Sequence, residues 1–154
     1  MLFRSVGLAA PQLGVPLRVL VLEDREELMA RVPAADRKLR GRVPYPLTTL
    51  INPVLSRLGD ASVTFFEGCL SVPGYMALVD RAEEVEVRGY GRDGAPVSLR
   101  VRGWPARILQ HEVDHLDGTL YVDRMRTRSL CANAAIQERW LTTPVDAVRK
   151  AFGA

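Results

Sequence analysis

The sequence predicts an α+β fold, in which strands fill the middle of the chain and helices come late. Residues 84–90 and 97–101 alternate apolar and polar side chains around Asp93-Gly94, a pattern typical of a β-hairpin. Residues 105–118 instead carry apolar side chains at helical spacing, with a proline at the start and a glycine at the end. Strands and helices that occupy separate parts of a chain indicate α+β rather than alternating α/β.

The chain before the hairpin predicts two strands and an insertion. Residues 6–14 are mostly small, and Pro11 argues against a helix through them. We therefore expect a tight backbone segment that lines a site of the protein. Residues 17–23 form a continuous β-prone run and predict a buried strand. Residues 24–46 are charged and broken by prolines, which favours a surface insertion with a short helical turn near residues 36–39. Residues 48–52 predict a second strand that Pro53 ends.

The helix after the hairpin has two different faces. Leu109, Val113 and Leu116 form an apolar stripe that we expect to face the core. The neighbouring face carries Ile108, His111, Glu112 and His115. A further helix is predicted at the C-terminus, starting at Thr143-Pro144 and leading to Phe152.

The composition predicts a single soluble domain that spans residues 1–154. Hydrophobic residues make up 47% of the chain and charged residues 25%, and no apolar run is long enough to cross a membrane. The net charge of +3 is mild, and aromatic residues do not interleave the basic ones, so we expect no DNA partner. The N-terminus shows no export signal, so we expect both cysteines to stay reduced.

The only two histidines of the chain, His111 and His115, flank a glutamate on the predicted helix. Residues four apart share a helix face, so both imidazoles can bind one metal ion. Glu112 follows the first histidine, where a carboxylate can move protons for a water on the metal. Two histidines placed at random would seldom fall in this pattern, so we favour a metal site over a surface helix that merely carries them.

A third ligand is needed, because catalytic sites usually hold a metal through three protein groups and leave one position for water. A zinc endopeptidase would use a later acidic residue, and Glu138 is the only glutamate downstream. Upstream lies Cys69, preceded by Gly68, which we expect to allow a tight turn. A Cys-His-His set is the more economical hypothesis, with a buried structural cysteine as the alternative.

Three stretches together resemble the peptide deformylase family. They are Gly7-Leu8-Ala9-Ala10-Pro11-Gln12, Glu67-Gly68-Cys69-Leu70-Ser71 and Gln110-His111-Glu112-Val113-Asp114-His115, in the family's order. The similarity extends from about Val6 to Arg126, and only Met1–Ser5 precede it, which is short for the family. The insertion after Asp24, Phe65-Phe66 and Gly103-Trp104 resemble a subgroup of organellar and some bacterial members.

The resemblance implies mainly antiparallel sheets packed around a central metal-binding helix, with a C-terminal helix. It implies one divalent metal ion, held by Cys69, His111 and His115. The resemblance favours Fe²⁺, with Zn²⁺, Ni²⁺ and Co²⁺ as alternatives. The ligands themselves do not decide the metal, because thiolate and imidazole suit zinc and iron alike. The implied reaction removes the formyl group from the N-terminal methionine of new polypeptides and releases formate.

The same resemblance assigns roles to individual residues. Glu112 is the general base, and the Gln12 amide and the Leu70 backbone N–H stabilise the developing oxyanion. Gly7 lets the substrate backbone lie close, and Glu67 pairs with Arg81 to hold the cysteine turn. The methionine pocket is assigned to Val6, Phe65, Trp104 and Ile108.

The expected partner is a formyl-methionyl nascent peptide, in bacterial cytoplasm or, alternatively, an organelle matrix. Arg124, Arg126 and Arg128 form a short basic cluster that could contact ribosomal RNA, but we favour a solvated face for so short a run. Two rival functions are weighed: a non-catalytic, metal-binding relative of the family, and a zinc endopeptidase. The presence of Cys69, both histidines, Glu112 and Gln12 together argues against both.

Overall fold

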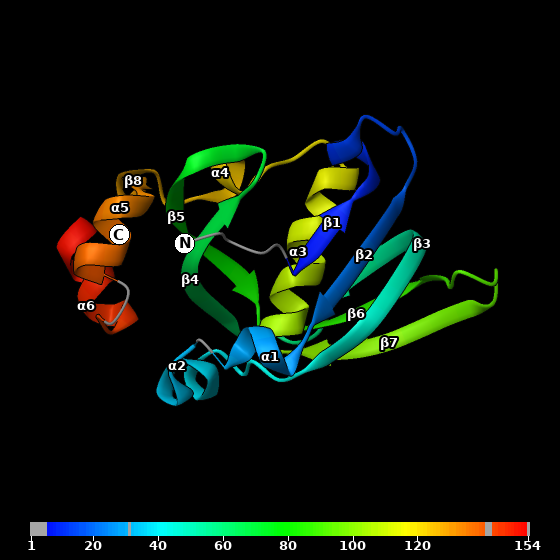
Figure 1. Ribbon diagram of the computed structural model, residues 1–154, viewed down its shortest axis with the longest axis horizontal. Helices are drawn as coiled ribbons and strands as arrows, with labels where there is room; N and C mark the ends of the chain where they lie inside the picture. Colours follow the sequence, from blue (N-terminus) through cyan, green and yellow to red (C-terminus); the bar gives the residue numbers. More distant parts are fainter. Residues whose placement is uncertain (1–5, 31, 141–142, 154) are drawn as a thin grey trace. The chain divides into compact units, whose positions relative to one another are not determined.

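The computed structural model describes residues 6–30, 32–140 and 143–153, and the chain divides into two compact units (Figure 1). The first unit comprises Met1–Ala61 and Ala82–Gly118. The second comprises Ser62–Arg81 and Thr119–Ala154. The expected Met1–Ser5 segment before the first motif lies outside the described residues.

The first unit contains a five-stranded antiparallel sheet. Its strands follow the order β1 (Gly7–Ala9), β2 (Val19–Asp24), β3 (Tyr45–Arg57), β6 (Glu84–Tyr90) and β7 (Pro96–Arg102). The predicted hairpin is confirmed as β6 and β7, and Gly94 in its turn has a φ of 78°, which glycine adopts without strain. The predicted buried strand at residues 17–23 is present as β2, but it buries alternate residues only.

Helix α3 (Trp104–Leu116) packs on this sheet and completes the core of the first unit (Figure 1). Leu109 and Val113 are buried in it, as the apolar stripe predicted. The helix follows Gly103, has Pro105 in its first turn and precedes Gly118, which has a φ of 71°. The predicted helix, its start and its end are therefore confirmed. The core cluster consists of Ala9, Leu20, Leu22, Leu50, Ala82, Val85, Val87, Val101, Ala106, Ile108, Leu109 and Val113.

Strand β3 corrects one prediction, because Pro53 does not end it. The pairing with β6 steps from Ile51 opposite Tyr90 to Val54 opposite Arg88, so β3 carries one extra residue at this point. Such a bulge leaves backbone groups out of the ladder, and a residue that lacks an N–H is tolerated there. Asn52 takes a φ of 49° in the bulge.

Two short helical segments were also placed differently by the sequence. Pro11 was expected to exclude a helix, yet η1 (Ala10–Leu13) is a 3₁₀ turn with this proline in its first turn, where no proline N–H is needed. The insertion holds α2 (Ala34–Leu39), which confirms the expected helical turn, and also α1 (Glu26–Met29), which the sequence did not predict. Its first residue, Asp24, is buried rather than on the surface.

The second unit holds a three-stranded sheet in the order β4 (Ser62–Cys69), β5 (Val72–Ala82) and β8 (Cys131–Ala132). Its short helical segments are α4 (Tyr121–Arg124), η2 (Thr127–Ser129), α5 (Asn133–Ala135) and the π-helical η3 (Ile136–Trp140). The predicted C-terminal helix is confirmed as α6 (Val145–Phe152), although the Thr143 hydroxyl donates backwards to the Arg139 carbonyl. Within the described residues, no helix has the length and apolar character needed to cross a membrane.

The bulge in β3 gives a test of backbone strain. The Asn52 side chain is exposed, so substitutions there change the conformational cost more than the packing. Because a β-branched residue strongly disfavours a positive φ, we expect Asn52→Val to lower the free energy of unfolding by about 1–2 kcal/mol. Asn52→Gly should be neutral or stabilising. Urea denaturation of both variants measures this, and equal stabilities would contradict the strain.

Candidate metal centre

The two histidines of α3 lie on one face of the helix, one turn apart. Their ring centroids are 5.1 Å apart and the ring planes meet at 77°. His115 is buried and His111 is partly exposed. Two imidazoles held this way offer neighbouring nitrogen ligands without any movement of the backbone.

Gln110 fixes the rotation of α3 against the neighbouring strand. Its side-chain oxygen accepts from the Ala82 N–H at 3.0 Å, and its side-chain nitrogen donates to the Ala82 carbonyl at 2.9 Å. The amide therefore pairs with the backbone as another strand would. The sequence placed Gln110 in a motif without giving it a role. A polar side chain directly before the first histidine was the only signal.

Both ends of α3 are held by residues far away in the sequence. At its start, the guanidinium carbons of Arg40 and Arg42 lie over the Trp104 ring, 5.2 and 5.5 Å from its centroid. Burial lowers the pKa of the Arg40 guanidinium, while the charge of nearby Asp36 acts in the opposite direction. At its end, Arg18 donates to the Leu116 carbonyl at 3.1 Å.

The Glu112 carboxylate is buried against the backbone of β1. A Cβ atom added to Gly7 would lie 2.4 Å from Glu112 Oε1 and 2.7 Å from its Cδ, far inside normal contact distances. Gly7 thus leaves the space that this side chain occupies. The sequence assigned Gly7 to the substrate backbone, and its contact with Glu112 was not anticipated.

Gln12 lies in η1, directly after β1. Its side-chain oxygen accepts from the Ala9 N–H at 2.9 Å, which fixes the orientation of the amide. A hydrogen bond to a substrate oxygen would have to come from the nitrogen of the same amide. The glycine that follows the turn, Gly14, has a φ of 75° and allows the chain to reverse.

Cys69 is the last residue of β4 in the second unit. Its sulfur accepts a hydrogen bond from the Ser71 N–H at 3.4 Å, an interaction that favours the thiolate. The expected turn at Gly68 is not present, because the strand continues through it. Gly68 lies instead in a crowded place, since a Cβ there would be 3.0 Å from Met76 Cγ and 3.3 Å from the Tyr75 carbonyl oxygen.

The buried ion pair predicted between Glu67 and Arg81 is present in the second unit. Arg81 Nε and Nη2 donate to the two carboxylate oxygens of Glu67 at 3.0 and 2.9 Å, and both side chains are buried. Tyr121 packs nearby and donates to the Tyr75 carbonyl at 3.0 Å. Burial raises the pKa of Tyr121, and the negative charges of Cys69 and Glu67 add to the increase.

One set of described residues has the donor chemistry of a metal site. Cys69 of the second unit and His111 and His115 of the first each offer one ligand atom of the kind that binds transition metals. A thiolate with two imidazoles fits zinc or ferrous iron, so the residues present match the group that the sequence implied.

The residues assigned to the methionine pocket are mostly packed against other side chains. Ile108 belongs to the core of the first unit, and Val6 and Trp104 pack against that core. Phe65 is buried in β4, whereas Leu70 follows the strand and is 61% exposed. Their roles toward a substrate stay predictions.

Comparison with known proteins identifies the family. The sequence profile of polypeptide deformylases matches residues 2–130, which is most of the chain. The chain belongs to the polypeptide deformylase family. It is 55% identical over 136 residues to peptide deformylase 1 of Streptomyces coelicolor, covering 88% of this chain and 61% of that protein. It is 52% identical over 125 residues to the chloroplastic peptide deformylase 1A of Solanum lycopersicum, covering 81% and 45%.

Solved structures of the deformylase family support the fold. The peptide deformylase of Synechococcus elongatus in complex with actinonin aligns with a TM-score of 0.64 and 38% sequence identity, covering 79% of this chain and 57% of that one. The predicted α+β class and the likeness to bacterial and organellar members are confirmed. The chain spans less than two thirds of the length of the two relatives named above.

The contact between Gly7 and Glu112 can be tested by a double-mutant cycle. We expect Gly7→Ala to lower the free energy of unfolding by about 1–3 kcal/mol, because the added methyl group overlaps the carboxylate side chain. In a Glu112→Ala background the overlap is gone, and the same substitution should cost less than about 0.5 kcal/mol. Chemical denaturation of the four proteins gives the coupling. An equal cost in both backgrounds would contradict the contact.

The buried ion pair of the second unit makes a separate prediction. Arg81→Met leaves the Glu67 carboxylate buried without its bidentate partner, so we expect a loss of about 3–5 kcal/mol in unfolding free energy. The double variant Glu67→Leu/Arg81→Met removes both charges and should be more stable than the single one. Guanidinium denaturation compares the two variants. A double variant no more stable than Arg81→Met would show that the unpaired Glu67 charge is not the cause of the destabilisation.

Proposed function

We propose that this chain carries the activity of its family: hydrolysis of the formyl amide at the N-terminal methionine of newly made polypeptides. The bond broken is that between the formyl carbon and the methionine nitrogen, and the products are formate and a free amino group. The observation that carries the proposal is the pair of histidines one turn apart on α3, with Glu112 directly after the first of them. Cys69 supplies the third donor in the proposed ligand set. The names of the relatives support it.

We propose Cys69, His111 and His115 as the ligands of one divalent ion, with Fe²⁺ favoured and Zn²⁺, Ni²⁺ or Co²⁺ as alternatives. When bound, such an ion would lower the pKa of a water molecule and polarise the formyl carbonyl. The Ser71 N–H supports the role of Cys69, because a hydrogen bond to sulfur favours its charged form.

Glu112 moves the proton in this proposal. Its carboxylate accepts a proton from the attacking water and later gives it to the leaving amine as the carbon–nitrogen bond breaks. Burial against β1 gives the carboxylate a defined position, and Gly7 maintains the space for it. The proton that leaves water therefore ends on the product amine.

The oxygen of the formyl group gains negative charge as water adds, and it needs donors already aimed at it. We propose the Gln12 side-chain nitrogen and the Leu70 backbone N–H. The hydrogen bond from the Ala9 N–H to the Gln12 oxygen supports this, since it fixes the orientation of the amide. The methionine pocket is proposed to involve Val6, Phe65, Trp104 and Ile108, and Gly7 to lie beside the substrate backbone.

The proposed partner is a formyl-methionyl peptide emerging from a ribosome, in bacterial cytoplasm or an organelle matrix. Bacterial and chloroplastic relatives support either compartment. A role for Arg126 in binding RNA gains no support, because its guanidinium pairs with Asp80 at 2.9 Å.

The proposal predicts formate release from a formyl-methionyl tripeptide by the iron-loaded protein prepared without oxygen. Glu112→Ala removes the proton acceptor and should lower kcat at least about 100-fold while metal binding persists. A coupled formate assay measures the rate and metal analysis the occupancy. Activity that is absent in both the iron and nickel forms would favour the non-catalytic relative.

The ligand set separates deformylase chemistry from an endopeptidase. Cys69→Ser should weaken zinc affinity by at least about tenfold, because a hydroxyl is a much poorer ligand than a thiolate. Glu138→Gln is the matched control and should leave the affinity unchanged. The reverse result, with Glu138 required and Cys69 dispensable, would point to a zinc endopeptidase.

A further inference from the structure

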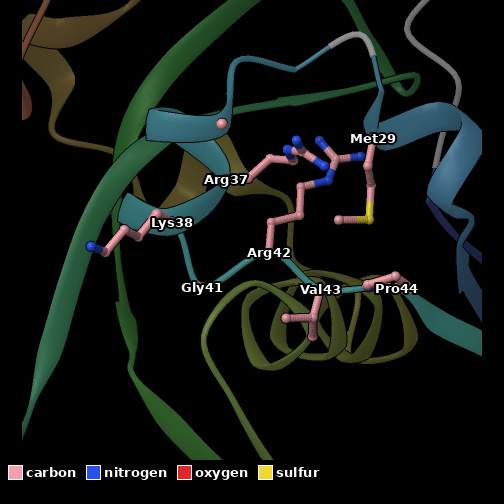
Figure 2. A pocket seen from close by; sticks show the side chains of 8 residues that line it. Met29, Arg37, Lys38, Gly41, Arg42, Val43 and Pro44 are labelled. Atoms are coloured by element: carbon pink, nitrogen blue, oxygen red, sulfur yellow. The ribbon is translucent and has the colours of Figure 1, made fainter.

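The insertion between β2 and β3 carries an open pocket on its surface (Figure 2). Its volume is about 470 Å³, and its walls come from α1, α2 and the residues just after α2. It is lined by Met29, Ala34, Arg37, Lys38, Gly41, Arg42, Val43 and Pro44. None of these residues is proposed to bind the metal ion or the substrate in the deformylase reaction.

The charge of this pocket has one sign. Three of its lining residues are cations, and none of them is acidic. Figure 2 shows the guanidinium groups of Arg37 and Arg42 pointing toward one another beside Met29, while Lys38 points away. Asp24 already balances the charge of Arg42, so the attraction of the lining for an anion comes from the other two cations.

Arg42 is held in place by a buried acid outside the pocket lining. Its Nε and Nη2 donate to the Asp24 carboxylate at 2.7 and 2.9 Å, and its Nη1 takes no part in that ion pair. Arg37 has a different state. Its Nε is buried and has no hydrogen-bond partner among the described residues. Because this nitrogen has no access from outside, an oxyanion would be bound through the terminal nitrogens of the Arg37 guanidinium, which present two donors side by side.

The rest of the pocket is apolar. Met29, Val43 and Pro44 provide hydrocarbon walls, and Met29 is only 3% exposed. A volume of about 470 Å³ is far larger than one phosphate or carboxylate group requires. The pocket therefore has room for an apolar body beside the charged group.

We propose that this pocket binds an organic oxyanion: a phosphate or carboxylate attached to a small apolar group. The oxyanion lies between Arg37 and Arg42, and the apolar part lies against Met29, Val43 and Pro44. This assignment is independent of the deformylase activity, because it uses other residues.

Trp104 provides a readout, because Arg42 contacts its ring. The chain has two tryptophans, so Trp140→Phe leaves Trp104 as the only one. At constant ionic strength, phenyl phosphate should change the Trp104 fluorescence in a saturable way, with inorganic phosphate at least about tenfold weaker. Benzoate tests the carboxylate arm, and benzyl alcohol, which has no charge, should not bind.

Arg37→Gln and Lys38→Gln form a matched pair, because they remove one charge each from neighbouring positions on α2. We expect Arg37→Gln to weaken phenyl phosphate binding about tenfold, and Lys38→Gln less than about twofold. Equal effects of the two variants would show a general charge effect and overturn the site. So would a lack of saturable binding by both anions, or equal affinity for benzyl alcohol. Thermal unfolding of each variant checks that its fold is unchanged.

Discussion

The packing of α3 on the five-stranded sheet sets the positions of His111, Glu112 and His115 in the first unit. Leu109 and Val113 are buried in the core, and this burial fixes the rotation of the helix about its axis. His111 and His115 then share the adjoining face, and Glu112 is directed at β1. A carboxylate in that position needs a strand without a side chain opposite it, so the helix chemistry depends on a glycine more than a hundred residues away.

The sequence predicts best those elements whose signals are local. Pro105, Gly118 and the turn glycine Gly94 each mark a boundary through their own backbone preference, and the structure has those boundaries. Predictions from the sequence are wrong where strands that are distant in the chain determine the local structure. Pro53 continues in β3 because a bulge against β6 accommodates it, and Gly68 lies in a strand against Met76 and Tyr75 of β5 rather than in a turn. Neither cause is visible within a few residues of the position that it governs.

The candidate site shows the same division between residue types and residue roles. Spacing and family resemblance predict the histidines, Cys69 and Glu112 as site residues, because ligand chemistry restricts the choice of residue. They did not reveal that Gln110 pairs with the backbone of Ala82, or that Gly7 makes room for Glu112. Such supporting roles follow from which strand lies against the helix, and a single sequence does not contain that information.

The supports of α3 act at three points along its length, and this explains how two imidazoles can be positioned before any ion arrives. Arg40 and Arg42 hold the ring of Trp104 at the start, Gln110 pairs with a strand in the middle, and Arg18 binds the final carbonyl. A helix held at a single point could still rotate or tilt, and its histidines would lose conformational freedom on binding a metal. With three supports, the helix loses this conformational freedom when the protein folds, and not when the metal binds. The charged insertion supplies the first support, so it contributes to positioning the histidines of the candidate metal site.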